Sequence, residues 1–190
     1  MKKRSSNEGN TSAHLRTLAL MAILAAMSMV LGKLLQIPIG NSIRISFENL
    51  PLIFAGFVFG PIGGGTVALV EDTVGSLIAF GEINPIVTAG AVSIGVLSGA
   101  LSRILVGRDL SRVSYPACAV SVAVPHIVGS MVIKSVGLYV FYRTAFPVLL
   151  ARVPIYLAIS VAESLIIWTL FKSSAVRSSL KPFIPSKNKD

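Results

Sequence analysis

The stretch VLLARVPIYLAISVAESLIIWTLF, residues 148–171, decides the fold. It is an apolar run that holds only two charged side chains, Arg152 and Glu163. About 20 consecutive, predominantly apolar residues are enough for an α-helix to cross the roughly 30 Å hydrocarbon core of a bilayer. The run therefore predicts a transmembrane helix.

The composition of the whole chain is also that of a membrane protein. Hydrophobic residues make up 53% of the 190 residues and charged residues only 13%, against about 25% charged residues in an average soluble domain. A soluble domain of this size would expose much of its surface to water, so we predict one polytopic, all-α membrane bundle. The single cysteine, Cys118, has no partner for an internal disulfide and is expected to be a small buried hydrophobe.

Five further apolar runs precede residues 148–171, so the sequence predicts six transmembrane helices. Pro51 suits the first turn of a helix, whereas Pro61 and the glycines 63–65 are expected to break the chain between the second and third helices. The predicted helices cover residues 15–35, 49–60, a third run ending near 80, 86–105, 118–142 and 148–171. The chain then divides into an N-terminal arm (1–14), a transmembrane domain (15–172) and a basic tail (173–190).

The distribution of basic residues predicts the orientation. With the N-terminus in the cytoplasm, the inner segments carry twelve Lys and Arg residues and the outer loops carry three. Cytoplasmic segments of membrane proteins are enriched in Lys and Arg, so we expect both termini in the cytoplasm. The same rule explains the net charge of +9 without a nucleic-acid partner. The outer residues are Lys33, Arg44 and Arg143, and the inner ones are Lys2, Lys3, Arg4, Arg16, Arg103, Arg108, Arg112, Lys172, Arg177, Lys181, Lys187 and Lys189.

Several classes of function lack their motifs. There is no G-x-x-x-x-G-K-[ST] loop, so the chain cannot bind ATP by that route or power transport alone. Neither H-E-x-x-H nor G-x-S-x-G is present, and two His and one Cys give no transition-metal cluster. No clear internal repeat indicates an inverted-repeat transporter. The apolar run after Lys2-Lys3-Arg4 is longer than that of a usual signal peptide and no clear cleavage site follows it. We expect neither an enzyme nor a cofactor.

Ionisable residues inside the predicted helices are the strongest indication of function. A charge at the bilayer centre costs roughly 2.5–3.5 kcal/mol on insertion scales, so such residues usually pair or line a polar cavity. Adjacent helical residues point about 100° apart, so we expect one of Glu71 and Asp72 to face a cavity and the other a neighbouring helix. The complete set is Glu71, Asp72, Lys134, Arg152 and Glu163.

Further polar and aromatic residues are predicted at the same level, in the outer half of the bundle. Arg152 and Tyr156 are spaced i, i+4 and so share one helix face. Phe47 and Glu48 belong to the first outer loop. Together these groups suit a flat, polar and partly anionic molecule. The predicted binding residues are Arg44, Phe47, Glu71, Asp72, Asn84, Lys134, Tyr139, Arg143, Arg152 and Tyr156.

Structural roles are the alternative for several of these residues. A carboxylate at position 71 or 72 also suits a buried ion pair with Lys134 or Arg152 that joins helices. Glu163 is predicted nearer the inner side, where we expect a structural or partner-facing role. His126 follows a proline and is expected to pack between helices rather than bind a ligand.

Eight short stretches follow one another in an order and spacing that resemble a known family. They are SIRISF (42–47), LP (50–51), AG (55–56), FGP (59–61), EDTVG (71–75), INP (83–85), PHIVGS (125–130) and RVPIY (152–156). The chain resembles the S-components of energy-coupling factor (ECF) transporters, the vitamin-binding subunits of bacterial importers, and most closely their folate-specific branch. The resemblance covers about residues 15–172. It implies a six-helix bundle in the plasma membrane, with an outer substrate cavity gated by the loop between the first two helices.

The resemblance also implies a function and partners. The chain would capture folate and deliver it to an importer that contains a second membrane subunit and two cytoplasmic ATPases. A carboxylate at position 71 or 72 would accept from the pterin edge, and an Arg or Lys would bind the anionic glutamate tail. Alternatives are another vitamin, such as pantothenate or thiamine, an accessory protein without a solute site, or an intramembrane enzyme. Small residues on the first helix form the docking surface in this family, with packing inside the bundle as the alternative; here they are Ala19, Ala22 and Ala26.

Overall fold

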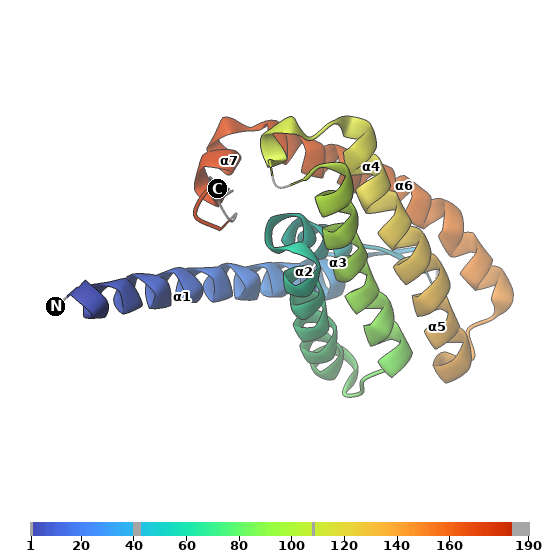
Figure 1. Cartoon of the computed structure of the whole chain (residues 1–190). Coiled ribbons are helices and arrows are strands. Elements are labelled where there is room, and N and C mark those ends of the chain that lie inside the picture. The colour runs from blue at the N-terminus through green and yellow to red at the C-terminus, as the bar shows by residue number, and fades with distance from the viewer. Residues whose placement is uncertain (1, 40–42, 108, 184–190) are drawn as a thin grey trace.

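The computed structural model describes residues 2–39, 43–107 and 109–183, and it is a bundle of helices with one short ribbon of strands (Figure 1). The predicted all-α membrane bundle is therefore confirmed, with the ribbon as an unpredicted addition. Two of the elements, η1 and η3, are π-helical and η2 is a 3-10 turn. In chain order the elements are α1 (Lys2–Met29), η1 (Val30–Leu34), β1 (Ile37–Ile39), β2 (Ile43–Ile45), α2 (Asn49–Phe80), α3 (Pro85–Leu105), η2 (Leu110–Arg112), α4 (Tyr115–Pro125), η3 (His126–Ile133), α5 (Lys134–Tyr142), α6 (Phe146–Lys172) and α7 (Ser174–Leu180).

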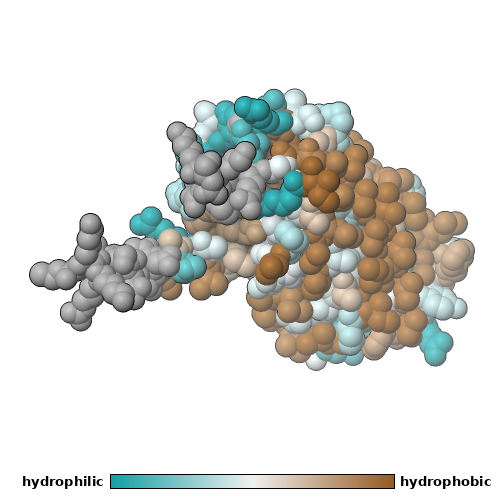
Figure 2. Space-filling view, viewed as in Figure 1, coloured by the Kyte–Doolittle hydropathy of each residue, from teal (hydrophilic) through white to brown (hydrophobic). Residues whose placement is uncertain are grey.

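Five helices in the described ranges are long and apolar enough to cross a membrane. Large apolar side chains lie exposed along these helices, and Figure 2 shows a broad hydrophobic surface over α4, α5 and α6. Such a surface is suited to the hydrocarbon of a bilayer, where helices satisfy their own backbone groups. The candidate spans are Ser12–Leu34, Asn49–Phe80, Pro85–Leu105, Tyr115–Tyr142 and Phe146–Lys172.

The second of these spans, α2, consists of two helical arms folded back on each other at Gly60. Gly60 has φ 80° and ψ −171°, a conformation that is essentially restricted to glycine. A Cβ built on Gly64 would lie 2.7 Å from the Cα of Gly56, whereas residues eight apart in a straight α-helix are about 12 Å apart. The arms 49–59 and 61–80 thus run antiparallel and correspond to the second and third predicted helices.

The predicted break between these arms lies in the right place but has a different cause. Pro61 and the glycines 63–65 are helical, and only Gly60 leaves helical geometry. Pro61 begins the second arm, where a helix has no use for an N–H donor. The glycines serve close packing, because Gly64 lies against the backbone carbonyl of Gly95 in α3. In a membrane, small residues let backbones approach closely enough for van der Waals contacts to hold the helices together.

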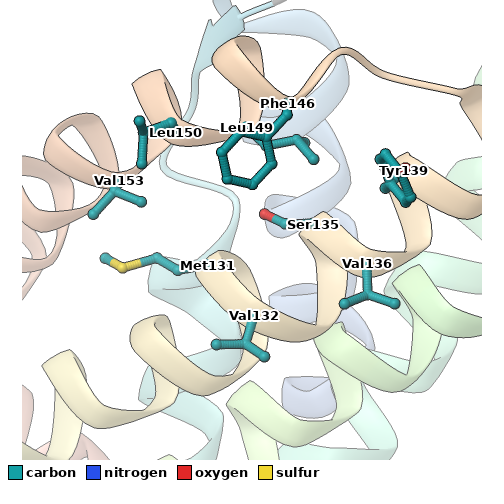
Figure 3. Close-up of a pocket in the computed structure, with 9 residues that line it drawn as sticks. All are labelled: Met131, Val132, Ser135, Val136, Tyr139, Phe146, Leu149, Leu150 and Val153. Carbon is teal, nitrogen blue, oxygen red and sulfur yellow. The ribbon is translucent and has the colours of Figure 1, made fainter.

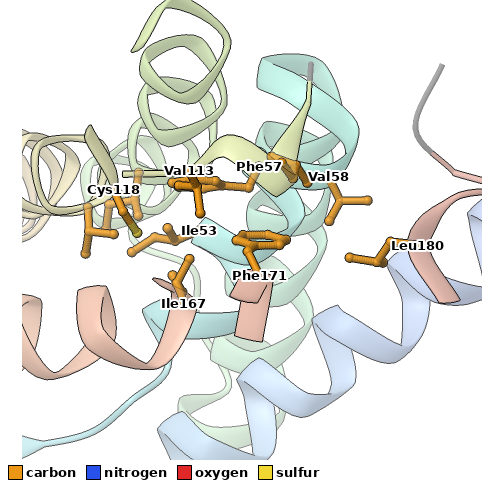
Figure 4. Packing of buried hydrophobic residues seen from close by; sticks show 11 residues of the cluster. Ile53, Phe57, Val58, Val113, Cys118, Ile167, Phe171 and Leu180 are labelled. Carbon is orange, nitrogen blue, oxygen red and sulfur yellow. The ribbon is translucent and has the colours of Figure 1, made fainter. Parts of the chain in front are cut away.

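An apolar core lies at the end of the bundle where the two arms of α2 meet (Figure 4). Phe171 of α6 stacks on Phe54 and Phe57 of the first arm, with ring centroids 5.3 Å and 5.5 Å apart. Cys118 is fully buried in the same cluster, as predicted. Leu180 of α7 also packs against it. Part of the predicted basic tail therefore returns to the bundle.

The described ends of the chain lie on one side of the bundle (Figure 1). In this view α1 begins at the left and α7 lies at the upper left, whereas the turn at 81–84 lies at the bottom and the turn at 143–145 at the lower right. The cytoplasmic assignment of both termini stays a prediction from charge. α1 runs without interruption through residues 14 and 15, so the arm continues the first transmembrane helix.

A two-stranded antiparallel ribbon connects the first transmembrane helix to α2. β1 pairs with β2 so that Ile37 lies opposite Ile45. The sequence predicts an outer loop for this segment and no strands. The ribbon leads directly to Phe47 and Glu48, which precede the first residue of α2, and β2 contacts α6.

Candidate functional site

A buried ion pair lies at the centre of the candidate site. Lys134 begins α5 directly after the π-helical segment η3, and its Nζ donates a hydrogen bond of 2.9 Å to Oε1 of Glu48. Glu48 is the residue before α2. The side chain of Lys134 is 6% exposed and that of Glu48 is 16% exposed. The pair therefore fastens the end of the ribbon segment to α5 inside the bundle.

Contacts with the first transmembrane helix hold Glu48 in this position. The hydroxyl of Ser28 donates to the backbone carbonyl of Glu48, and a Cβ built on Gly32 would lie 2.7 Å from Oε2 of Glu48. Burial by itself raises the pKa of Glu48, but the positive charges of Lys134 and Lys33 outweigh it and lower the pKa to about 2. Glu48 is thus ionised and paired at neutral pH.

The adjacent carboxylates Glu71 and Asp72 are both buried but face different surroundings. Oδ2 of Asp72 accepts a hydrogen bond of 2.6 Å from the Thr88 hydroxyl of α3. Oε1 of Glu71 is buried without a hydrogen-bond partner among the described residues, and Glu71 interacts electrostatically with Glu48 and Lys134. Asp72 therefore faces the neighbouring helix. Glu71 faces the buried charged side chains, and we call this group, Glu48, Glu71, Lys134 and Arg152, the polar centre.

A second polar group lies along α6. Arg152 is buried, and its Nη2 donates a hydrogen bond of 3.2 Å to the hydroxyl of Tyr156. Nη1 of Arg152 is buried without a partner among the described residues. The Tyr156 ring lies 6.2 Å from the ring of His126, whose Nε2 is 2.6 Å from Oε2 of Glu163. The last two side chains are fully buried and join η3 to α6, in agreement with the structural roles expected for them.

Asn84 serves the fold in this structure. Its Oδ1 accepts hydrogen bonds from the backbone N–H groups of Ile86 and Val87 at the start of α3, as an N-cap residue does. Its Nδ2 donates to the carbonyl of Gly137 in α5. The amide is therefore occupied in holding α3 against α5.

Three of the remaining predicted binding residues, Phe47, Tyr139 and Arg143, line apolar pockets or the surface. Tyr139, which is 56% exposed, lines an apolar pocket of about 550 Å³ between α5 and α6 (Figure 3). Phe47 lines another of about 400 Å³ against α6. Arg143 is exposed and has a left-handed backbone that ends α5. The backbone of Arg44 lies in β2, but its side chain is outside the described part of the structure.

Apart from the hydroxyl groups of Ser135 and Tyr139, both pockets are lined by apolar side chains, and neither contains a charged residue. Glu71, Lys134 and Arg152 lie deeper in the bundle, where their polar atoms pair with the protein or have no described partner. Within the described ranges, no three His, Cys, Asp or Glu side chains converge as a metal site.

Sequence reasoning missed the role of Glu48. It placed this residue in the outer loop but left it out of the binding set, because nothing in the spacing connects it to Lys134, 86 positions away. Its place before the helix start at Asn49-Leu50-Pro51 is the available signal, since carboxylates favour helix N-termini. Thr88, the partner of Asp72, carried no such signal.

The predicted docking residues lie on a free face of α1. Ala19, Ala22 and Ala26 are exposed, whereas Ala25 and Ser28 on the other side of the helix are buried. These three alanines are not packed inside the bundle in this structure, and their role in docking stays a prediction.

Comparisons with known proteins agree with one another. A family model described as "ECF transporter, substrate-specific component" matches residues 16–177. The fold is similar to the crystal structure of FolT bound with folic acid, with a TM-score of 0.66 at 18% identity over 82% of this chain and 92% of that chain. It is also similar to the S-component for biotin from an ECF-type ABC transporter, with a TM-score of 0.65 at 16% identity over 90% of this chain and 97% of that one.

A third solved structure, described as the S component of a bacterial ECF transporter, has a TM-score of 0.63 at 19% identity over 88% of this chain and 99% of that one. At these identities the similarity concerns the fold. No curated protein sequence matches this chain.

Proposed function

The chain belongs to the family of substrate-specific components of ECF transporters, and from this premise we propose that it captures folate at the outer face of the plasma membrane. Members of this family are integral plasma-membrane proteins that bind vitamins and act with ECF membrane and ATPase subunits; they are not enzymes. Because the chain belongs to a family of substrate-specific components, the alternative of an accessory protein without a solute site is excluded. The vitamin itself is the proposal.

The observation that favours folate is that two buried side chains of opposite charge type, Glu71 and Arg152, each have a polar atom without a partner among the described residues. Glu71 presents a buried carboxylate oxygen without a partner, and Arg152 presents a buried Nη1 without a partner in the described chain. A pterin edge carries adjacent N–H donors that a carboxylate accepts as a pair, and the glutamate tail carries carboxylates that Arg binds in a fork. Lys134 supplies a second cation for the tail.

Other vitamins pair with fewer of the side chains Glu71, Arg152 and Lys134 than folate does. Thiamine is a cation without a carboxylate, so it suits Glu71 but leaves Arg152 and Lys134 unmatched. Pantothenate and biotin each carry a single carboxylate and suit the basic side chains, but neither has a pterin-like edge for Glu71. A buried charge left without a partner lowers affinity, so we expect folate to bind more tightly than these three.

Two further parts of the proposal concern topology. We place the termini, the Gly60 turn and α7 on the cytoplasmic side, in accord with the excess of Lys and Arg there. This puts the ribbon and Glu48 on the outer side, above the polar centre, where a solute enters. The face of Ala19, Ala22 and Ala26 is then the docking surface for the ECF membrane subunit, because small residues allow close contact between helices in a bilayer.

Calorimetric titration of the purified chain in detergent tests the substrate. Folate is the principal ligand, with biotin, pantothenate and thiamine as comparators. We expect one-to-one binding of folate that is tighter than binding of any comparator. Tight binding of a comparator with no heat from folate would make that comparator the substrate and leave the family role unchanged. Well-folded protein that binds none of the four ligands would contradict the proposal.

A further inference from the structure

The ion pair between Glu48 and Lys134 occupies a cation that the proposed function assigns to the substrate. Lys134 is one of the cations assigned to the anionic end of the substrate, yet its Nζ is already 2.9 Å from a carboxylate oxygen of the protein. Both partners are largely buried, at 6% and 16% side-chain exposure. A solute carboxylate that binds Lys134 in the same direction therefore has to take the place of Glu48.

We propose that Glu48 is an internal stand-in for the substrate carboxylate: it pairs with Lys134 and is displaced when an anionic solute binds there. This inference rests on the proposed function for the identity of the solute but not for the pairing itself. Glu48 acts as a positioning residue in this scheme. It keeps the buried amine neutralised and oriented until the solute supplies its own negative charge.

The position of Glu48 in the chain suits a displaceable group. It stands between the β1–β2 ribbon and the first residue of α2, so its side chain can leave Lys134 through movement of a short connecting segment. The alternative anchors, Glu71 and Asp72, stand inside the second arm of α2 and have no such freedom. A buried ammonium is costly without a partner, which is why an exchange of carboxylates is favoured over simple release.

The contacts of Glu48 with the first transmembrane helix link this exchange to α1 and η1. Ser28 donates to its carbonyl, and Gly32 leaves room for its side chain. A methyl group at position 32 would lie 2.7 Å from Oε2 and 2.9 Å from Cβ of Glu48, so Gly32→Ala forces Glu48 to move without altering its charge. The two variants, Glu48→Gln and Gly32→Ala, thus weaken the same contact by different means.

Acetylation of lysines, read by mass spectrometry on the full chain in detergent, tests the pairing without any vitamin. An amine held by a carboxylate reacts slowly, so we expect Lys134 to acetylate about tenfold faster in Glu48→Gln and in Gly32→Ala, the difference between a charged and a neutral hydrogen bond. The exposed lysines Lys172 and Lys181 serve as internal references. Equal Lys134 rates in the wild type and in both variants would overturn the proposal.

Glutarate, a small dicarboxylate, tests the competition in the same assay. We expect it to slow acetylation of Lys134 in Glu48→Gln at concentrations that leave the wild-type rate unchanged. Protection of both proteins at the same concentration would show that Glu48 does not compete with anions and would overturn the proposal. If Glu48→Gln does not fold, the acetylation rate of Lys134 in Gly32→Ala, compared with the wild type, still tests the pairing, because Gly32→Ala retains the carboxylate.

Folate binding then separates this proposal from the substrate assignment. We expect Glu48→Gln to bind folate about tenfold more tightly, while its affinity for a pterin without the glutamate tail is unchanged. Weaker folate binding in Glu48→Gln would make Glu48 a ligand of the solute and overturn the stand-in role. If the wild type binds none of the vitamins, the substrate assignment fails, and the acetylation and glutarate results still decide the role of Glu48.

Discussion

Glu71 and Asp72 are neighbours in the chain, yet the structure gives them different chemistry. Asp72 accepts from Thr88, whereas Glu71 has a buried oxygen without a described partner. We expect Glu71→Gln to weaken folate binding by roughly 1–3 kcal/mol, the cost of leaving a buried polar group without its partner. The matched control, Asp72→Asn, should lower the unfolding temperature and change the affinity much less. Calorimetry and thermal unfolding measure the two effects. If Asp72→Asn weakened folate binding and Glu71→Gln only lowered the unfolding temperature, Asp72 would be the binding residue and Glu71 the structural one.

Glu48 provides a prediction about pH. Burial by itself raises the pKa of Glu48. The positive charges of Lys134 and Lys33 lower it by more, so the pKa falls from 4.5 to about 2. Since the pKa in the folded state is below its ordinary value, the stabilisation by the ion pair is complete above pH 4.5 and is lost as the pH falls toward 2. The difference in unfolding temperature between the wild type and Glu48→Gln should therefore stay constant from about pH 7 to pH 5 and shrink below that range.

The exposed carboxylate Glu82 gives the control for this measurement. Glu82→Gln removes a charge of the same kind from an exposed turn, where its side chain interacts with Tyr142, so its unfolding temperature should change less than that of Glu48→Gln at neutral pH. A loss of the Glu48 effect between pH 7 and pH 5 would show that the pair is not the source of the stabilisation.

At the scale of elements, the hairpin in α2 depends on glycine for two separate reasons. Gly60 supplies a backbone angle that other residues avoid, and Arg103 of α3 donates to the Val58 carbonyl just before it, where a helix end leaves acceptors free. Gly64 supplies space, since an added Cβ would meet the backbones of Gly56 and Gly95. The turn and the packing of the arms are thus distinct requirements.

We therefore expect Gly64→Ala to destabilise the protein more than Gly81→Ala. Gly81 has φ 74° with nothing within 4 Å of an added Cβ, so its replacement costs only the strain of a left-handed residue, of order 1 kcal/mol. Gly64→Ala forces two backbones apart and should cost about 2–4 kcal/mol, as overpacking and lost helix contacts combine. Unfolding in detergent followed by circular dichroism measures both, and equal effects would show that the close approach of the arms is unimportant.

The sequence predicts most of these elements because apolar length is a local property. Residues 148–171 are apolar for long enough to span a bilayer and do form α6, and the turn at residues 81–84 also lies where expected. The missed features depend on distant partners. The break at Gly60 rather than at residues 61–65 reflects packing against α3, and the contact between Glu48 and Lys134 joins residues 86 positions apart. The β1–β2 ribbon contains too few residues to show a strand pattern.

At the scale of the whole molecule, substrate-specific components of ECF transporters act together with ECF membrane and ATPase subunits. The free face of Ala19, Ala22 and Ala26 on α1 lies on the opposite side of the helix from Ser28, which contacts Glu48. A partner on α1 would thus sit one helix diameter from the binding site. We expect Ala22→Trp to leave folate affinity unchanged and to abolish the complex with the ECF membrane subunit, because a large side chain prevents close helix contact.

Co-purification with the ECF membrane and ATPase subunits, alongside calorimetry on the isolated chain, measures these two properties separately. Ala89→Trp is the matched control, since Ala89 is an exposed alanine on a different helix, α3, and should affect neither assembly nor binding. Assembly retained in Ala22→Trp would move the docking surface away from this face. Loss of assembly in both variants would show a general effect of a bulky surface residue. Loss in Ala22→Trp alone would place the energised partner against α1, where its docking can act on the Glu48 segment and so on release of the solute.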